Sequence, residues 1–113
     1  MYSDILDEND VKCLEFDMEH QNWMRISQNY VLSEDFIRRY QNKVDWNEIS
    51  CSQNLSEDFI KEFQDKVYWY WISYKQELSK EFIIEFSDKI NFNNIIVNNK
   101  ISDEVKELCK IFL

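Results

Sequence analysis

Large apolar side chains return along this chain at a constant interval of 23 residues. One series consists of aromatic rings: Trp23, Trp46, Trp69 and Phe92. A second series consists of branched aliphatic residues: Leu32, Leu55, Leu78 and Ile101. A constant period of this size is the sequence signature of a repeat protein. The chain is therefore predicted to be one small structural unit copied about four times.

The period divides the 113 residues, taken as a single repeat domain, into three complete copies at 32–54, 55–77 and 78–100. The flanking segments are diverged or incomplete. A half repeat at 23–31 follows an acidic N-terminal cap at 1–22, and a C-terminal cap occupies 101–113. Terminal units that differ from interior ones are expected in a repeat array, because they cap its ends.

Polar and apolar residues in the first half of each copy follow the period of an amphipathic helix of about three turns. Phe36, Tyr40 and Val44 stand four residues apart and form one apolar stripe. A serine stands where each helix needs an N-cap: Ser33, Ser56, Ser79 and Ser102. Acidic residues follow these serines and lysines stand near the far end of the interior copies, which complements the helix dipole.

The second half of each copy predicts a shorter helix. Trp46 and Ile49 are three residues apart, which puts them on one face of a helix, whereas a strand would alternate. Asn22, Asp45 and Asn91 precede the ring and can cap this helix. A single unit buries too little apolar surface to offset the entropy of ordering its backbone, so neighbouring copies must stack. The predicted fold is all-α, a short α-solenoid of about four helix–turn–helix repeats.

The composition agrees with this fold class and restricts the chemistry. The chain has no glycine and no proline, so tight β-hairpins are disfavoured. Phosphate-binding loops and nucleophile elbows both need glycine and are excluded. We therefore expect a protein without enzyme activity, cofactor or metal. The single histidine, His20, has no second histidine to share a metal and is expected to be a solvated surface residue.

The three cysteines are too few and too widely spaced for a disulfide framework. Reduced thiols indicate a cytoplasmic protein, and no apolar run is long enough to span a membrane. Cys13 and Cys109 fall where other copies have core aromatic residues, so both are expected to be buried. Cys51 is expected on a connecting turn.

The net charge of −9 is concentrated in the N-terminal cap at 1–22, where Lys12 is the only lysine or arginine. Its acids are Asp4, Asp7, Glu8, Asp10, Glu15, Asp17 and Glu19. Direct nucleic-acid binding is disfavoured because phosphates need basic contacts, and a partner with a basic surface is expected. The cap is either the polar face of a capping helix or an imitation of nucleic-acid phosphates. Arg25, Arg38 and Arg39 either pair with acids or form a solvated face.

The second complete copy departs from the others in four aromatic residues: Tyr68, Tyr70, Trp71 and Tyr74. The equivalent residues of the first copy are Asp45, Asn47, Glu48 and Cys51. Those of the third copy are Asn91, Asn93, Asn94 and Val97. Tyrosine and tryptophan are enriched at the energetic centres of protein interfaces. The rings either bind a protein partner, a second copy included, or pack internally against a neighbouring copy.

The segments LSEDFIRRYQNKVDWNEIS and LSEDFIKEFQDKVYWYWIS resemble a short helical repeat found in tandem arrays in proteins of large DNA viruses and phages. The resemblance covers residues 23–101 and implies a binding scaffold without catalytic residues. The expected function is non-enzymatic protein binding in the host cytoplasm, by analogy as an inhibitor of a host defence protein such as a CRISPR effector. The alternatives are an acidic nucleic-acid mimic and a self-assembling structural protein. We expect a monomer or weak homo-oligomer that contacts neither nucleic acid nor membrane directly.

Overall fold

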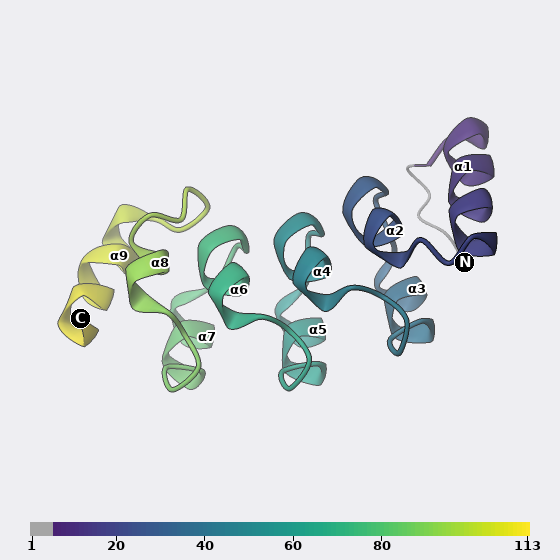
Figure 1. The fold of residues 1–113 in the computed structure, drawn as a ribbon. Coiled ribbons are helices and arrows are strands. Elements are labelled where there is room, and N and C mark those ends of the chain that lie inside the picture. The colour runs from purple at the N-terminus through teal and green to yellow at the C-terminus, as the bar shows by residue number, and fades with distance from the viewer. Residues whose placement is uncertain (1–5) are drawn as a thin grey trace. The chain divides into compact units, whose positions relative to one another are not determined.

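The computed structural model describes residues 6–113, and the regular structure within that range consists of helices without strands (Figure 1). The all-α class predicted from the period is therefore confirmed, with two short helices in each interior copy. The elements are α1 (Glu8–Glu19), α2 (Trp23–Asn29), α3 (Glu34–Arg39), α4 (Trp46–Ser52), α5 (Glu57–Glu62), α6 (Trp69–Lys75), α7 (Lys80–Glu85), α8 (Phe92–Ile95), α9 (Asp103–Cys109) and the 3-10 helix η1 (Lys110–Phe112).

The chain divides after Gln53 into two compact units, each described here by itself. In the first unit α1 packs on α2, and α2 packs on α4. In the second unit α6 packs on α8, and α8 packs on α9. The helix from the second half of one copy thus lies against its counterpart from the next copy, at α2–α4 and again at α6–α8. This is the stacking of helix pairs that the repeat predicts.

The first-half helices are shorter than the predicted three turns, since α3, α5 and α7 have six residues each. In the first copy the helix ends at Arg39, with Tyr40 as its C-cap, and side chains then satisfy carbonyl groups around the following turn. The Gln41 side chain donates to the Arg38 carbonyl at 3.0 Å, and the Trp46 indole donates to the Gln41 carbonyl at 2.9 Å. Val44 is buried although it lies beyond the end of the helix. Its four-residue spacing from Tyr40 therefore predicted a helix longer than the one observed.

Side-chain caps begin almost every described α-helix. The predicted serine caps each accept a hydrogen bond from the backbone N–H three residues on: Ser33, Ser56, Ser79 and Ser102. The predicted caps of the shorter helices do the same: Asn22, Asp45 and Asn91. Asp7 caps α1 in a reciprocal capping box with Asp10. Among the α-helices of residues 6–113, only α6 starts without a side-chain cap hydrogen bond, because Tyr68 stands there.

Aromatic rings join successive copies inside each unit. Trp69 lies 6.1 Å from Phe82 and 5.5 Å from Phe86, measured between ring centroids. Phe92 occupies the tryptophan position one copy later, where Cys109 replaces the aromatic partner. There Phe92 stacks on Phe112 of η1 at 4.6 Å, so the last turn supplies the ring that Cys109 lacks.

A ladder of buried amide side chains links the backbones of adjacent copies. The Gln53 side chain donates to the carbonyls of Ser27 and Tyr30 at 2.9 and 2.6 Å, and accepts from the Leu32 N–H at 3.0 Å. In the second unit Asn98 donates to two carbonyls, those of Ser73 and Gln76, at 2.9 Å each. Buried backbone groups need such partners, so the ladder fixes how the copies stack.

The ladder was not predicted from the sequence, because an amide in a polar segment resembles any surface residue. A usable signal was present, since Gln53 and Gln76 stand one period apart. Asn98 comes one residue early in the third copy, after α8, which has four residues where α4 and α6 have seven.

Candidate protein-binding site

The four aromatic residues singled out in the second copy form what we call the α6 aromatic surface: Tyr68, Tyr70, Trp71 and Tyr74. Tyr70 and Trp71 meet edge to face, with ring centroids 4.9 Å apart and an interplanar angle of 86°. Trp71 meets Tyr74 at 6.1 Å and 64°. These are preferred geometries for aromatic pairs. The structure therefore brings three of the four predicted rings together, while Tyr68 precedes them at the start of the helix.

The α6 helix turns its aliphatic side inward and its aromatic side outward. Ile72 and Ser73 are fully buried, and they anchor the helix to its own unit. Tyr68 and Tyr70 are 52% and 53% exposed, and Trp71 and Tyr74 are half-buried. The rings thus have an inner edge that supports them and an outer edge that faces solvent.

The neighbouring helix holds this surface through a backbone contact. The Asn94 amide on α8 donates to the Tyr70 carbonyl at 2.9 Å. A cation also borders the rings, since the Lys75 ammonium nitrogen lies 5.1 Å from the centroid of Tyr74. An ammonium at this distance over a ring face makes a favourable cation–π contact. The surface therefore combines exposed rings with one positive charge.

Tyr68 occupies the N-cap position of α6, where the equivalent residues Asn22, Asp45 and Asn91 each accept a backbone hydrogen bond. A capping side chain contributes about 0.5–2 kcal/mol to the stability of its helix. The α6 helix forgoes this contribution, and a half-exposed ring stands in its place.

Most of the acidic segment predicted at 1–22 forms the helix α1, and Asp7 is the N-cap of that helix. Five of its acids are exposed: Asp7, Glu8, Asp10, Glu15 and Glu19. Two of these carboxylates are already engaged locally. Asp7 accepts from the Asp10 N–H at 2.8 Å, and Asp10 accepts from the Asp7 N–H at 3.3 Å. Asp4, another of the seven predicted acids, lies outside the described residues.

Asp17 does not belong to the acidic surface, and that prediction is wrong. Its side chain is buried and accepts hydrogen bonds from the Tyr30 hydroxyl at 2.7 Å and from Arg25 Nε at 3.1 Å. One arginine therefore does pair with the acidic segment. Tyr30 stands one period before Gln53, so a phenol replaces the ladder amide at this end and ties α1 to the repeat. Burial, reinforced by the hydrogen bond to Asp17, raises the pKa of Tyr30 to about 12.

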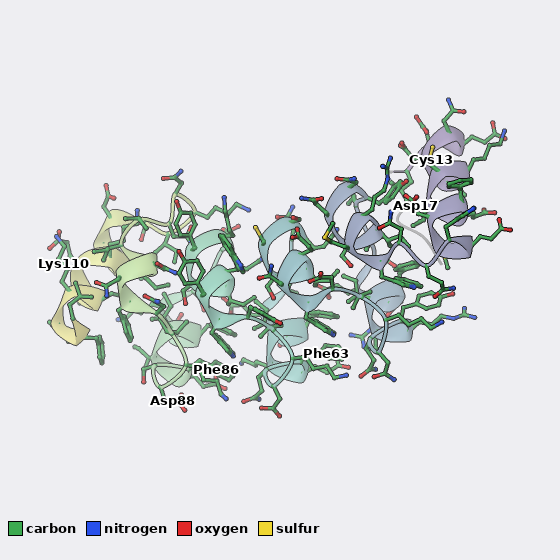
Figure 2. All side chains as sticks on the ribbon, in the orientation of Figure 1. Cys13, Asp17, Phe63, Phe86, Asp88 and Lys110 are labelled. Atoms are coloured by element: carbon green, nitrogen blue, oxygen red, sulfur yellow. The ribbon has the colours of Figure 1, made fainter. Side chains whose placement is uncertain are left out.

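The three cysteines and the histidine differ in how far each is exposed to solvent. Cys109 is buried as predicted, and burial raises the pKa of its thiol. The other two cysteine predictions are wrong, since Cys13 is exposed on α1 (Figure 2) and Cys51 is a half-buried residue of α4. The predicted surface position of His20 is confirmed. Residues 6–113 contain no group of three or more His, Cys, Asp or Glu side chains arranged to hold a metal ion.

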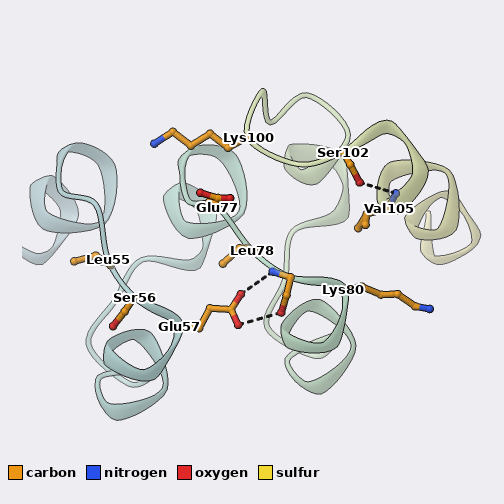
Figure 3. Close-up of a pocket in the computed structure, with 10 residues that line it drawn as sticks. Leu55, Ser56, Glu57, Glu77, Leu78, Lys80, Lys100, Ser102 and Val105 are labelled. Carbon is orange, nitrogen blue, oxygen red and sulfur yellow. Dashed lines mark hydrogen bonds between the residues drawn. The ribbon is translucent and has the colours of Figure 1, made fainter.

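A groove of about 560 Å³, lined by both polar and apolar side chains, runs along the second unit beside the starts of α5, α7 and α9 (Figure 3). Its most engaged group is the Glu57 carboxylate, which accepts hydrogen bonds from the Ser79 N–H and the Ser79 hydroxyl at 2.6 and 3.0 Å. The carboxylate thus serves to join two successive copies. Ser79 Oγ in turn accepts from the Phe82 N–H at 3.2 Å, so the same serine also caps α7.

Comparison with protein-family models, with curated proteins and with solved structures finds no match to this chain. None of the helices in the described part is long and apolar enough to cross a lipid bilayer. The assignment of a function therefore depends on the residues of the candidate site.

Proposed function

We propose that this chain is a non-enzymatic protein-binding repeat module, and that the α6 aromatic surface is its principal contact. The observation that carries the proposal is the exchange at Tyr68. A stabilising side-chain N-cap is given up there for an exposed tyrosine, and the exposed Tyr70 meets Trp71 edge to face. Aromatic residues of this kind lose little conformational entropy on binding and dominate interface energies.

The charge of the chain supports a partner with a basic surface. The net charge is −9, and five exposed acids line α1 and its N-cap. Exposed like charges of this density attract a basic protein over several ångströms and raise its association rate. In this proposal the acids steer the partner, and the rings determine how slowly it leaves.

The biological setting that we propose is inhibition of a host defence protein by a viral or phage protein in the host cytoplasm. Its support is the resemblance of the repeat to arrays in proteins of large DNA viruses and phages. A nucleic-acid-guided nuclease such as a CRISPR effector has the basic groove that an acidic inhibitor would meet. Fold alone does not assign this role, so it is tested with the partner.

A second candidate function is nucleic-acid mimicry by α1. The observation that favours it is the row of exposed carboxylates along a helix of 12 residues. The burial of Asp17 removes one charge from that row. Mimicry predicts binding that collapses as salt concentration rises, since exposed charges are screened within about 10 Å at 0.1 M salt. Contact through rings predicts binding that persists.

The test is affinity capture from host lysate with three versions of the chain. The variant Tyr68→Asp/Tyr70→Asn/Trp71→Glu places first-copy residues at the second-copy positions, so it keeps a side-chain set that the repeat already tolerates. The control Phe16→Ala/Met24→Ala removes two other exposed apolar side chains, which are 59% and 57% exposed in the first unit. All three versions are compared by quantitative mass spectrometry at low and at high salt.

We expect the wild type and the control to retain the same partner at both salt concentrations and the second-copy variant to lose it. Equal capture by all three versions would refute a role for the α6 aromatic surface. A fourth version, Glu8→Gln/Glu15→Gln/Glu19→Gln, tests mimicry. Capture that is lost at high salt for the first three versions, and that this fourth version abolishes, would instead favour mimicry.

A further inference from the structure

The C-terminal end of the second unit carries another surface that departs from the repeat. An apolar groove of about 230 Å³ lies between α7 and α9 with η1. Apart from Lys80, its lining is apolar: Ile83, Ile84, Val105, Leu108, Cys109, Ile111 and Phe112. Ile84 is 55% exposed, Leu108 48% and Ile111 79%. We call this surface the α7–α9 groove.

One copy earlier, the same positions hold an ion pair. Lys61 Nζ on α5 lies 3.2 Å from Glu85 Oε1 on α7, and this pair bridges two successive first-half helices. The residues one period after Lys61 and Glu85 are Ile84 and Leu108, respectively. Both positions of an exposed ion pair have therefore become aliphatic, although they are still half-exposed.

The turn after α9 shows the same exchange. Asp88 and Lys89 of the third copy correspond to Ile111 and Phe112 of the C-terminal cap. Stacking on Phe92 accounts for the aromatic ring at position 112 in part, but the Phe112 side chain is still 50% exposed. Ile111 has no comparable burial. Four positions that are charged one copy earlier have thus become apolar on one face, and a contiguous exposed apolar patch marks an interaction surface.

Charge indicates which occupant the groove can accept. The chain as a whole is strongly acidic, but residues 80–113 contain five lysines against six acids. Two copies of this protein therefore repel each other less at this end than at the N-terminal cap, where seven acids stand against one lysine. The rim is of mixed sign, as the Lys110–Glu107 pair at 2.7 Å illustrates. A rim of mixed sign can meet its own copy across a two-fold axis with lysines opposite acids.

We propose that two copies of this chain associate through the α7–α9 groove in a closed, two-fold contact. Ile84, Leu108 and Ile111 of one copy cover the same residues of the other. The α6 aromatic surface takes no part in this contact, so the inference stands or falls separately from the proposed function.

The test restores the ion pair of the preceding copy at the groove. Ile84→Lys/Leu108→Glu reproduces the Lys61–Glu85 pair that the fold already accommodates. A second variant, Ile111→Asp, introduces the equivalent of Asp88 at a 79% exposed position, so it does not disturb the core. The control Val97→Asn changes an exposed apolar residue that does not line the groove. Mass is measured by sedimentation equilibrium over a wide concentration range, and helicity by circular dichroism.

For the wild type and Val97→Asn we expect the mass to rise with concentration from 14.0 kDa to twice that value and to stop there. Both groove variants should keep the wild-type helicity and dimerise at least about tenfold more weakly. The proposal is overturned by a wild type that stays at one-copy mass at millimolar concentration. A mass that grows without limit, or groove variants that dimerise as strongly as the wild type, would overturn it equally.

Discussion

Single residues that depart from the repeat join α1 to it. Tyr30 takes the ladder position that Gln53 fills one copy later, and its hydroxyl reaches the buried Asp17 carboxylate at 2.7 Å. Arg25 Nε approaches the same carboxylate oxygen at 3.1 Å. The two hydrogen bonds from Tyr30 and Arg25 replace hydrogen bonds to water that the Asp17 carboxylate loses on burial. A buried carboxylate is tolerated only when it has such partners. A residue that appeared to be surface charge is instead part of the internal structure.

Replacing Tyr30 by phenylalanine tests this arrangement. Tyr30→Phe removes a hydrogen bond to a buried carboxylate, so we expect a loss of about 1–3 kcal/mol in the free energy of unfolding at neutral pH. The measurement is urea unfolding followed by circular dichroism. An unchanged midpoint would contradict the assigned role.

The pH dependence of the same variant gives a second readout. Burial raises the pKa of Tyr30 from 10.0 to about 12, so the folded state favours the neutral phenol. The stability that Tyr30 contributes is therefore complete below pH 10 and is lost as the pH rises to about 12. Wild-type stability should fall more steeply across this window than that of Tyr30→Phe. Parallel pH profiles would contradict the raised pKa.

At the scale of the helix, α6 starts with the exposed Tyr68 in place of a side chain that would cap and stabilise the helix. The variant Tyr68→Asp gives α6 the cap that Asp45 gives α4. We expect it to raise the free energy of unfolding by about 1 kcal/mol, the usual value of such a cap. The matched control Asp45→Ala should lower it by a similar amount. If Tyr68→Asp is less stable than the wild type, Tyr68 has a structural role and the exchange argument fails.

The amide ladder carries the connection between neighbouring copies. Gln53→Leu leaves one buried N–H and two buried carbonyls, those of Leu32, Ser27 and Tyr30, without their side-chain partner. Each orphaned group costs about 1–3 kcal/mol, so a total loss of at least about 3 kcal/mol is expected in thermal or urea unfolding. Gln28→Leu, at an exposed position of α2, should change stability very little. A change in stability for Gln53→Leu that is as small as that for Gln28→Leu would show that the ladder is dispensable.

Much of the helical framework was predictable, because each repeated signal has a local cause. Serine caps such as Ser33 and apolar stripes such as that through Phe36 act within one turn, and the period confirmed them by repetition. The helix ends were not predictable. The α3 helix ends after six residues, where the Gln41 side chain donates to the Arg38 carbonyl, and Val44 is nevertheless buried beyond that end. The ladder was missed because its hydrogen bonds join residues more than 20 positions apart.

For the whole molecule, comparison of the copies separates scaffold from function. The α6 aromatic surface was found in the sequence because it breaks the repeat inside a complete copy. The α7–α9 groove breaks it in the C-terminal cap, where divergence is expected, so only the exposure of Ile84 and Leu108 revealed it. The acidic cap was predicted from charge alone, and charge does not distinguish exposed Glu15 from buried Asp17.

The most direct measurement is the affinity of the captured partner for the wild type and for Tyr68→Asp/Tyr70→Asn/Trp71→Glu, determined by isothermal titration at two salt concentrations. Hot-spot residues contribute about 2 kcal/mol or more each, so the variant should bind at least about a hundredfold more weakly. Its melting temperature should equal or exceed that of the wild type, because Asp at position 68 caps α6. Wild-type affinity in a fully folded variant would contradict the assignment of the α6 aromatic surface as the binding site.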